Sequence, residues 1–179
     1  MTLIEFTDYQ CPYCRRHFEQ TLPRSVADYV DTGKVRYVVR EFPLTKIHSR
    51  AAKAAEAALC AAEQNKYWEM HDRLFHDQRK LSLPDLAAHA EALELDLASF
   101  QSCLQEGKYS ETIQAGLDEA AKAGVSGTPS FLLGLTDRDH PGQVTATEYL
   151  RGAMPYARFQ QVIDKLLAGD KVQPGETEE

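Results

Sequence analysis

Two cysteines separated by two residues stand where an apolar segment gives way to a helical pattern, and this placement constrains the fold more than any other feature. The motif is Cys11-Pro12-Tyr13-Cys14, and it follows a short predicted strand over residues 2–6. Positions i and i+3 of a helix share a face, so the two thiols lie near enough to form one reversible disulfide. Pro12 suits the first helical position because its missing N–H would have had no partner there.

Cys11 comes directly before the predicted helix, where unpaired backbone N–H groups and the positive end of the helix dipole gather. Such a field stabilises a thiolate and lowers the pKa of the cysteine. We therefore expect Cys11 to have a lowered pKa. The alternatives for such a pair are half of a structural zinc site or an inert disulfide.

The first fifty residues predict a strand, a helix and a second strand. The helix that opens at Pro12 is expected to continue through Tyr29, where its apolar spacing ends. Residues 35–42 are rich in β-branched and aromatic side chains and predict the second strand. This order indicates a right-handed crossover between parallel strands.

A long block without strand signal follows, and the chain then returns to strands. Between Ser49 and Ala123 the pattern predicts helices at about 49–64, 66–78, 84–93, 97–106 and 109–123. A glycine-flanked turn over 124–134 leads into an apolar strand, residues 137–142 form a polar loop, and 144–150 predict an antiparallel partner. Pro155 opens a last helix, and the segment after Gly169 is expected to be frayed.

Length and charge restrict the class of protein. A chain of 179 residues is the size of one domain, with room for an inserted subdomain. The net charge of −7 argues against nucleic acid or an anionic membrane surface as the main partner. No apolar stretch approaches the roughly 20 residues that span a bilayer, and the printed N-terminus lacks the order of a secretory leader. Four cysteines are too few for a fold of this length to be held together by disulfides, so a hydrophobic core must stabilise it.

The two halves and the block between them resemble the thioredoxin fold with a DsbA-type helical insertion. The segments that carry the resemblance are Glu5 to Cys14, Ala57 to Gln64, Tyr67 to Asp72 and Gly124 to Phe131. It implies an α/β fold with a mixed central sheet, made of β-α-β and β-β-α halves. The thioredoxin-like domain would comprise residues 1–47 and 124–169, the all-helical insert residues 48–123, and a flexible tail residues 170–179.

The resemblance implies a role for each residue of the motif. Cys11 is expected to be an exposed nucleophile that forms a mixed disulfide with a partner thiol, which Cys14 then resolves. Pro12 and Tyr13 are expected to neighbour the active site, and Tyr13 occupies the variable position that tunes the redox potential.

Three further residues are expected at the site. The resemblance implies a cis peptide bond at Pro129, opposite Cys11, whereas the alternative is an ordinary trans turn. Thr128 would offer its hydroxyl and backbone to the thiolate or the substrate. Glu5 would be a buried acid that accepts the proton of Cys14, unless it faces outward from its strand. Asp8 is expected to be a turn residue.

Other polar and aromatic residues receive structural interpretations. Arg15, Arg16 and His17 are expected on a solvated helix face. The remaining histidines show no metal-ligand spacing and are interpreted as structural or surface residues: His48, His71, His76, His89 and His140. An aromatic and apolar run is expected in the core of the insert, with a substrate groove as the alternative for its tryptophan: Tyr67, Trp68, Met70, Leu74 and Phe75.

Cys60 and Cys103 fall on predicted helices of the insert, 43 residues apart. As in some DsbA-like proteins, they could form a second disulfide that pins two helices together, which would favour an oxidising compartment. Two buried free thiols are the alternative.

The function expected from this resemblance is thiol-disulfide exchange with protein thiols, preferably in the oxidising direction and without a cofactor. A membrane redox partner would then reoxidise a monomeric enzyme outside the cytoplasm, if a leader was removed, and a cytoplasmic location is the alternative. The other functions considered are a reductase or isomerase of the same superfamily, a metal-binding module that uses Cys11, Cys14 and His17, and a chaperone module.

Overall fold

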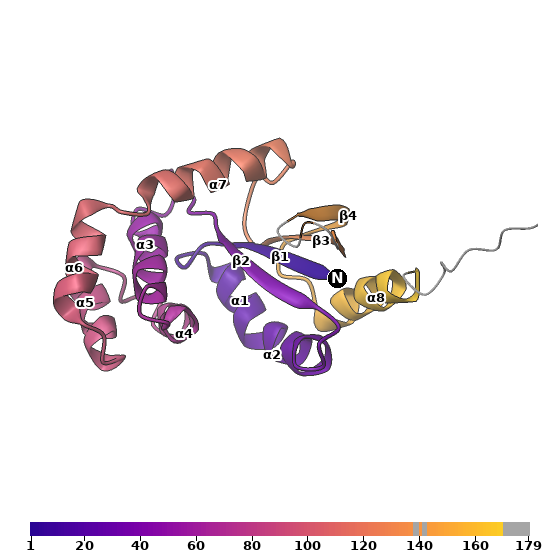
Figure 1. Ribbon diagram of the computed structural model, residues 1–179, viewed down its shortest axis with the longest axis horizontal. Helices are drawn as coiled ribbons and strands as arrows, with labels where there is room; N and C mark the ends of the chain where they lie inside the picture. Colours follow the sequence, from indigo (N-terminus) through magenta and orange to yellow (C-terminus); the bar gives the residue numbers. More distant parts are fainter. Residues whose placement is uncertain (138–139, 141–142, 170–179) are drawn as a thin grey trace, which may run out of the picture.

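The computed structural model describes residues 1–137, 140 and 143–169, and Figure 1 shows how their helices and strands are arranged. The expected tail at 170–179 and most of the loop expected at 137–142 lie outside the described residues. The elements in chain order are β1 (Thr2–Thr7), α1 (Pro12–Gln20), α2 (Leu22–Ser25), the π-helical turn η1 (Val26–Val30), β2 (Arg36–Glu41), α3 (Ala51–Ala62), α4 (Tyr67–His76), α5 (Leu83–Ala92), α6 (Leu97–Glu106), α7 (Ser110–Lys122), β3 (Ser130–Thr136), β4 (Val144–Arg151) and α8 (Tyr156–Gly169).

The strands form one mixed sheet in the order β2-β1-β3-β4. β1 and β2 are parallel, as expected for a strand-helix-strand crossover. β3 pairs antiparallel with both β1 and β4. The predicted thioredoxin fold with a β-α-β half and a β-β-α half is therefore confirmed.

Helices cover both faces of this sheet. On one face Phe6 packs in a cluster with Ala120 of α7 and Val125 beyond it. On the other face Leu3 packs with Tyr29 of η1 and Phe159 of α8. Successive side chains of a strand point to opposite faces. Glu5 therefore shares the face of Leu3, and that face also carries α1 (Figure 1).

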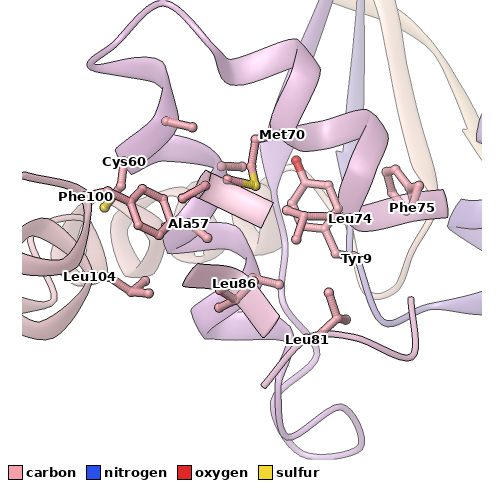
Figure 2. Close-up of a cluster of buried hydrophobic side chains, with 14 of the residues drawn as sticks. Tyr9, Ala57, Cys60, Met70, Leu74, Phe75, Leu81, Leu86, Phe100 and Leu104 are labelled. Atoms are coloured by element: carbon pink, nitrogen blue, oxygen red, sulfur yellow. The ribbon is translucent and has the colours of Figure 1, made fainter. Parts of the chain in front are cut away.

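The helices α3 to α6 gather beyond one end of the sheet, and α7 runs back from them toward β3 (Figure 1). They enclose a separate apolar core, into which Tyr9 projects from the loop after β1 (Figure 2). A disulfide between Cys60 and Cys103 joins α3 to α6, with 6.0 Å between the two Cα atoms. Because the cluster also contains Cys11 and Cys14, this core reaches the cysteine motif.

Local signals explain where the insert helices begin and end. The Ser82 hydroxyl accepts from the backbone N–H of Asp85, whose carboxylate accepts from the Ser82 N–H in return, so α5 starts with a capping box. The Asp96 carboxylate caps α6 by accepting from the Ser99 N–H at 2.7 Å. Gly107 ends that helix with a φ of 63°, in the left-handed region that glycine adopts without strain.

The helix expected to continue from Pro12 through Tyr29 is interrupted, so this expectation was wrong. The α-helix α1 stops at Gln20, and two short pieces, α2 and η1, follow it. Pro23 explains the break, because it has no N–H to donate to residue 19 and its ring crowds that carbonyl. The Ser25 hydroxyl donates to the carbonyl oxygen of Thr21, which lies at the interruption.

Two side chains lie opposite to expectation. Trp68 was expected in the core but is 48% exposed, because it lies two residues before the buried Met70, on nearly the opposite side of α4. His17 was expected on a solvated face but is 1% exposed, because it follows Cys14 by three residues and shares its inward face. The His17 ring packs against Phe131, with 4.5 Å between ring centroids.

Candidate active site

Cys11 and Cys14 lie at the start of α1, with Cys11 as the residue that precedes the helix and Pro12 as its first residue. Both are free thiols. Cys14 is fully buried, and Cys11 is 4% exposed. The expectation of an exposed Cys11 was therefore wrong, because the segment before β3 covers its sulfur.

That covering segment contains Thr128 and Pro129, joined by a cis peptide bond. The Cys11 thiol points at the carbonyl oxygen of Thr128, with 3.5 Å between Sγ and O. Pairing of Phe6 in β1 with Ser130 in β3 brings the two segments together. The Thr128 hydroxyl is buried without a hydrogen-bond partner.

The two thiols have opposite acidities. Donation from the Cys14 thiol lowers the pKa of Cys11 to about 6, and the backbone N–H groups of Cys14 and Tyr13 and the Thr128 hydroxyl add to this effect against the cost of desolvation. Burial raises the pKa of Cys14 well above its usual value, and the charges of Cys11 and Glu5 raise it further. At neutral pH the pair therefore holds one thiolate and one thiol.

Glu5 is 2% exposed and its carboxylate points into the protein beneath this pair. The Thr7 hydroxyl donates to its Oε1 at 2.9 Å, and the Tyr37 hydroxyl donates to its Oε2. The same Tyr37 oxygen lies 3.1 Å from Nε2 of His17. Of the two orientations considered for Glu5, the structure has the inward one.

A second buried carboxyl group, Glu41, was not anticipated. Its Oε1 accepts from the hydroxyls of Tyr9 at 3.1 Å and Tyr67 at 2.8 Å, whereas its Oε2 is buried without a partner. Desolvation raises the pKa of Glu41 to about 8, and the charge of Glu5 contributes to the rise. The available sequence signal was weak, since Glu41 follows Arg40 in β2 and resembles another exposed charged residue of that strand.

The loop between β1 and α1 is held from two sides. The Asp8 carboxylate accepts from the backbone N–H groups of Gln10 at 2.7 Å and Leu44 at 2.8 Å, which agrees with its predicted role in a turn. The Gln78 amide donates to the carbonyl oxygens of Tyr9 at 2.7 Å and Cys11 at 3.0 Å. Sequence reasoning missed Gln78, since nothing in its surroundings marks a residue that acts across 67 positions.

Tyr13 is 56% exposed beside the cysteines, and the Arg16 guanidinium lies over its ring at 5.2 Å. Within the described ranges, no group of three or more histidine, cysteine, aspartate or glutamate residues is arranged to hold a metal ion. No helix in the described part of the chain combines the length and the apolar character that crossing a membrane requires.

A mixed sheet of this order, a CxxC pair at a helix start and a cis-proline segment opposite it define a thioredoxin-fold dithiol protein. The family model described as thioredoxin matches residues 1–165. The chain therefore belongs to the thioredoxin family, and its helical insert makes it DsbA-like.

Relatives and solved structures agree with this assignment. The crystal structure of Wolbachia pipientis alpha-DsbA1 superposes with a TM-score of 0.79 at 26% identity, and covers 94% of this chain and 86% of that chain. The probable disulfide bond formation protein D of Bacillus anthracis is 29% identical over 135 residues, which are 72% of this chain and 62% of that protein.

A third similarity is to part of a much longer protein. The chain is 42% identical over 142 residues to Na(+)/H(+) antiporter NhaA 3 of Salinispora tropica, and the match covers 79% of this chain. It spans only 21% of the length of that antiporter.

Proposed function

We propose that this chain exchanges disulfides with the thiols of proteins or peptides through Cys11 and Cys14. The observation that carries the proposal is the unequal thiol pair, in which a sulfur with a pKa of about 6 faces the Thr128 carbonyl group and its partner stays protonated. The thiolate is the attacking species in disulfide exchange, and a low pKa also makes a good leaving group.

The proposed direction is oxidation of the substrate. Ionisation of Cys11 stabilises only the reduced form, since a sulfur bonded in a disulfide carries no charge. Stabilising the reduced form raises the reduction potential and makes the disulfide a stronger oxidant. The opposite direction, as in a reductase or isomerase, is the alternative that a potential measurement separates.

The proposed substrate surface surrounds the cis-proline segment. Backbone groups next to Pro129 would pair with an extended substrate, and the Thr128 hydroxyl, which has no partner, would donate to the thiolate. The exposed Tyr13 would contact the substrate from the other side of the sulfur.

Several broader features belong to the same proposal. The thioredoxin-like domain would comprise residues 1–47 and 124–169, and the insert residues 48–123. The enzyme would act as a monomer outside the cytoplasm, without a cofactor, and a membrane redox partner would reoxidise it. The Cys60–Cys103 bond supports an oxidising compartment. Ion transport is not proposed, because the alignment covers about a fifth of the antiporter.

Equilibration of the Cys11–Cys14 pair with glutathione buffers tests the direction. A potential near or above about −130 mV supports an oxidase, and one near about −270 mV supports a reductase. Oxidative refolding of a reduced disulfide protein tests the activity itself. The Cys11→Ser variant should be inactive, and wild-type protein that fails to accelerate refolding or insulin reduction would refute the exchange function.

A further inference from the structure

The Glu5 carboxylate is held by a chain of hydrogen bonds that continues past it into α1. The Tyr37 hydroxyl has one hydrogen, which it donates in a hydrogen bond to Glu5 Oε2. Because this hydrogen is engaged with Glu5, the Tyr37 oxygen can only accept from His17. In the contact of 3.1 Å between the Tyr37 oxygen and His17 Nε2, the histidine is therefore the donor. Burial lowers the pKa of His17, so the ring is neutral at pH 7 and carries its proton on Nε2.

We propose that Tyr37 is a positioning residue for the exchange reaction: held by His17, its hydroxyl aims the Glu5 carboxylate so that this group exchanges a proton with Cys14. The inference rests on the proposed disulfide exchange and assigns a role to a β2 residue in it. Tyr37 acts through Glu5, so its effect should be confined to the step that uses Cys14.

In a mixed disulfide between Cys11 and a substrate sulfur, the Cys14 thiol gives its proton to Glu5, and its sulfur attacks the Cys11 sulfur. The Cys11–Cys14 bond forms while the bond to the substrate breaks, and the substrate sulfur leaves with the electron pair as a thiolate. In the oxidising direction the same steps run backward, and Glu5 returns the proton to the departing Cys14 sulfur.

The surroundings of Glu5 leave Tyr37 as the group suited to this role. The ionisable groups that act on Glu5 or are acted on by it are Cys14 and His17 from α1, Tyr37 and Glu41 from β2, and Tyr67 from α4. Across the sheet the β3 neighbour is the apolar Phe131. Thr7 holds the other carboxylate oxygen from the same strand. The Tyr37 hydroxyl is thus the group that hydrogen-bonds Glu5 Oε2 in the structure, and its loss removes the bond that fixes the direction of this oxygen.

The position of the Tyr37 ring makes the hydroxyl testable by itself. The ring lines a cavity of about 960 Å³ between α1, η1, β2 and α4, together with Phe18 and Trp68. The substitution Tyr37→Phe keeps the aromatic ring between the cavity and Glu5 and removes only the hydroxyl. Tyr29→Phe is a matched control, because the Tyr29 hydroxyl also donates to a carboxylate, that of Asp164, at 2.8 Å and away from the cysteines.

Stopped-flow reaction of the reduced protein with one equivalent of 5,5′-dithiobis(2-nitrobenzoate) separates the two steps. Attack by Cys11 releases the first nitrothiobenzoate, and attack by Cys14 releases the second, so a Cys14→Ala variant should show only the first phase. We expect Tyr37→Phe to leave the rate of the first phase within about twofold of the wild-type rate. The second phase should be about tenfold slower at pH 7, which is the effect expected from losing a hydrogen bond to a charged group. The midpoint of the pH profile of the second phase should move upward.

Two comparisons make the result decisive. Glu5→Gln should slow the second phase at least as much, and adding Tyr37→Phe to it should slow that phase no further. Tyr29→Phe should leave both phases unchanged. If Glu5→Gln slows the second phase but Tyr37→Phe does not, or if neither does, the role of Tyr37 is refuted while the exchange function stands. A wild-type protein that releases no second equivalent would instead refute the exchange function.

Discussion

The side-chain amide of Gln78 donates a hydrogen bond of 3.0 Å to the backbone carbonyl oxygen of Cys11. A residue that follows α4 of the insert thereby fixes the backbone of Cys11, and its second bond fixes Tyr9 in the same loop. Through this contact the geometry of the site depends on the insert being folded.

Replacement of Gln78 tests that dependence. Gln78→Glu keeps the size of the side chain but replaces the donor by an acceptor facing two carbonyl oxygens. We expect disulfide exchange to fall about tenfold and thermal stability to fall by about 1–3 kcal/mol, the cost of leaving buried polar groups unpaired. Gln64→Glu, at another amide side chain that donates to a backbone carbonyl, is the control. Equal losses of activity in both variants would argue against a special role for Gln78.

The acidity of Cys11 predicts how the stability of the reduced protein depends on pH. Its pKa is about 6 in the folded protein, against 9.0 for an ordinary thiol. Between these values the folded state has released a proton that the unfolded chain keeps. The free energy of unfolding of the reduced protein should therefore rise with pH, by up to about 1.4 kcal/mol per unit.

The oxidised protein provides the reference for this measurement, because it has no Cys11 thiolate. Urea denaturation of both forms at pH 6, 7 and 8 should show the reduced form gaining stability relative to the oxidised one. A difference that stays constant over this range would mean that Cys11 has an ordinary pKa.

Glu41 predicts a pH dependence of the opposite sign in both redox forms. Its pKa is raised from 4.5 to about 8, so the folded state holds a proton that the unfolded chain loses above about pH 4.5. This stabilising contribution is complete below that pH and is lost as the pH rises to about 8, by up to about 1.4 kcal/mol per unit.

Glu41→Gln isolates this contribution, because glutamine resembles the protonated acid and still accepts from Tyr9 and Tyr67. The variant should be as stable as the wild type near pH 4 and more stable near pH 8, as measured by urea denaturation of the oxidised proteins. Parallel curves for the two proteins would show that Glu41 does not change its protonation on folding.

The Cys60–Cys103 bond is expected to stabilise the insert without taking part in exchange. Chain entropy assigns about 4 kcal/mol to the loop that it closes. The double variant Cys60→Ala/Cys103→Ala should therefore unfold at a lower urea concentration. Its Cys11 alkylation rate at pH 7 should match that of the wild type, and a large change in this rate would show that the bond also shapes the active site.

Much of the fold follows from patterns that local physics determines. The alternating and β-branched segments gave β1 and β2, and the capping residue Ser82 and the glycine Gly107 mark boundaries of insert helices where the sequence breaks them. The prediction missed the break near Thr21. The helical spacing of apolar residues continues past Pro23, and the prediction followed this spacing although Pro23 has no backbone N–H to donate.

The site was predictable as far as its motif extends. The cysteine pair and the threonine-proline step are short local signals. The partners that tune them are brought in by tertiary packing: Tyr37 from β2, Glu41 beside it, and Gln78 from the insert. Helical spacing alone also led to the wrong prediction that Trp68 is buried, whereas the buried face of α4 carries Met70 and Leu74. Residue types do not reveal such contacts before the chain has folded.

Cys11 and the Thr128 carbonyl group that it faces are 117 positions apart. During synthesis the cysteine pair leaves the ribosome first, and the proline segment emerges only after the entire insert. A growing polypeptide therefore exposes these sulfurs before it has the backbone segment that covers Cys11 in the folded protein. Until that segment has been made and has folded over them, these sulfurs are open to reaction with any thiol or disulfide that they meet.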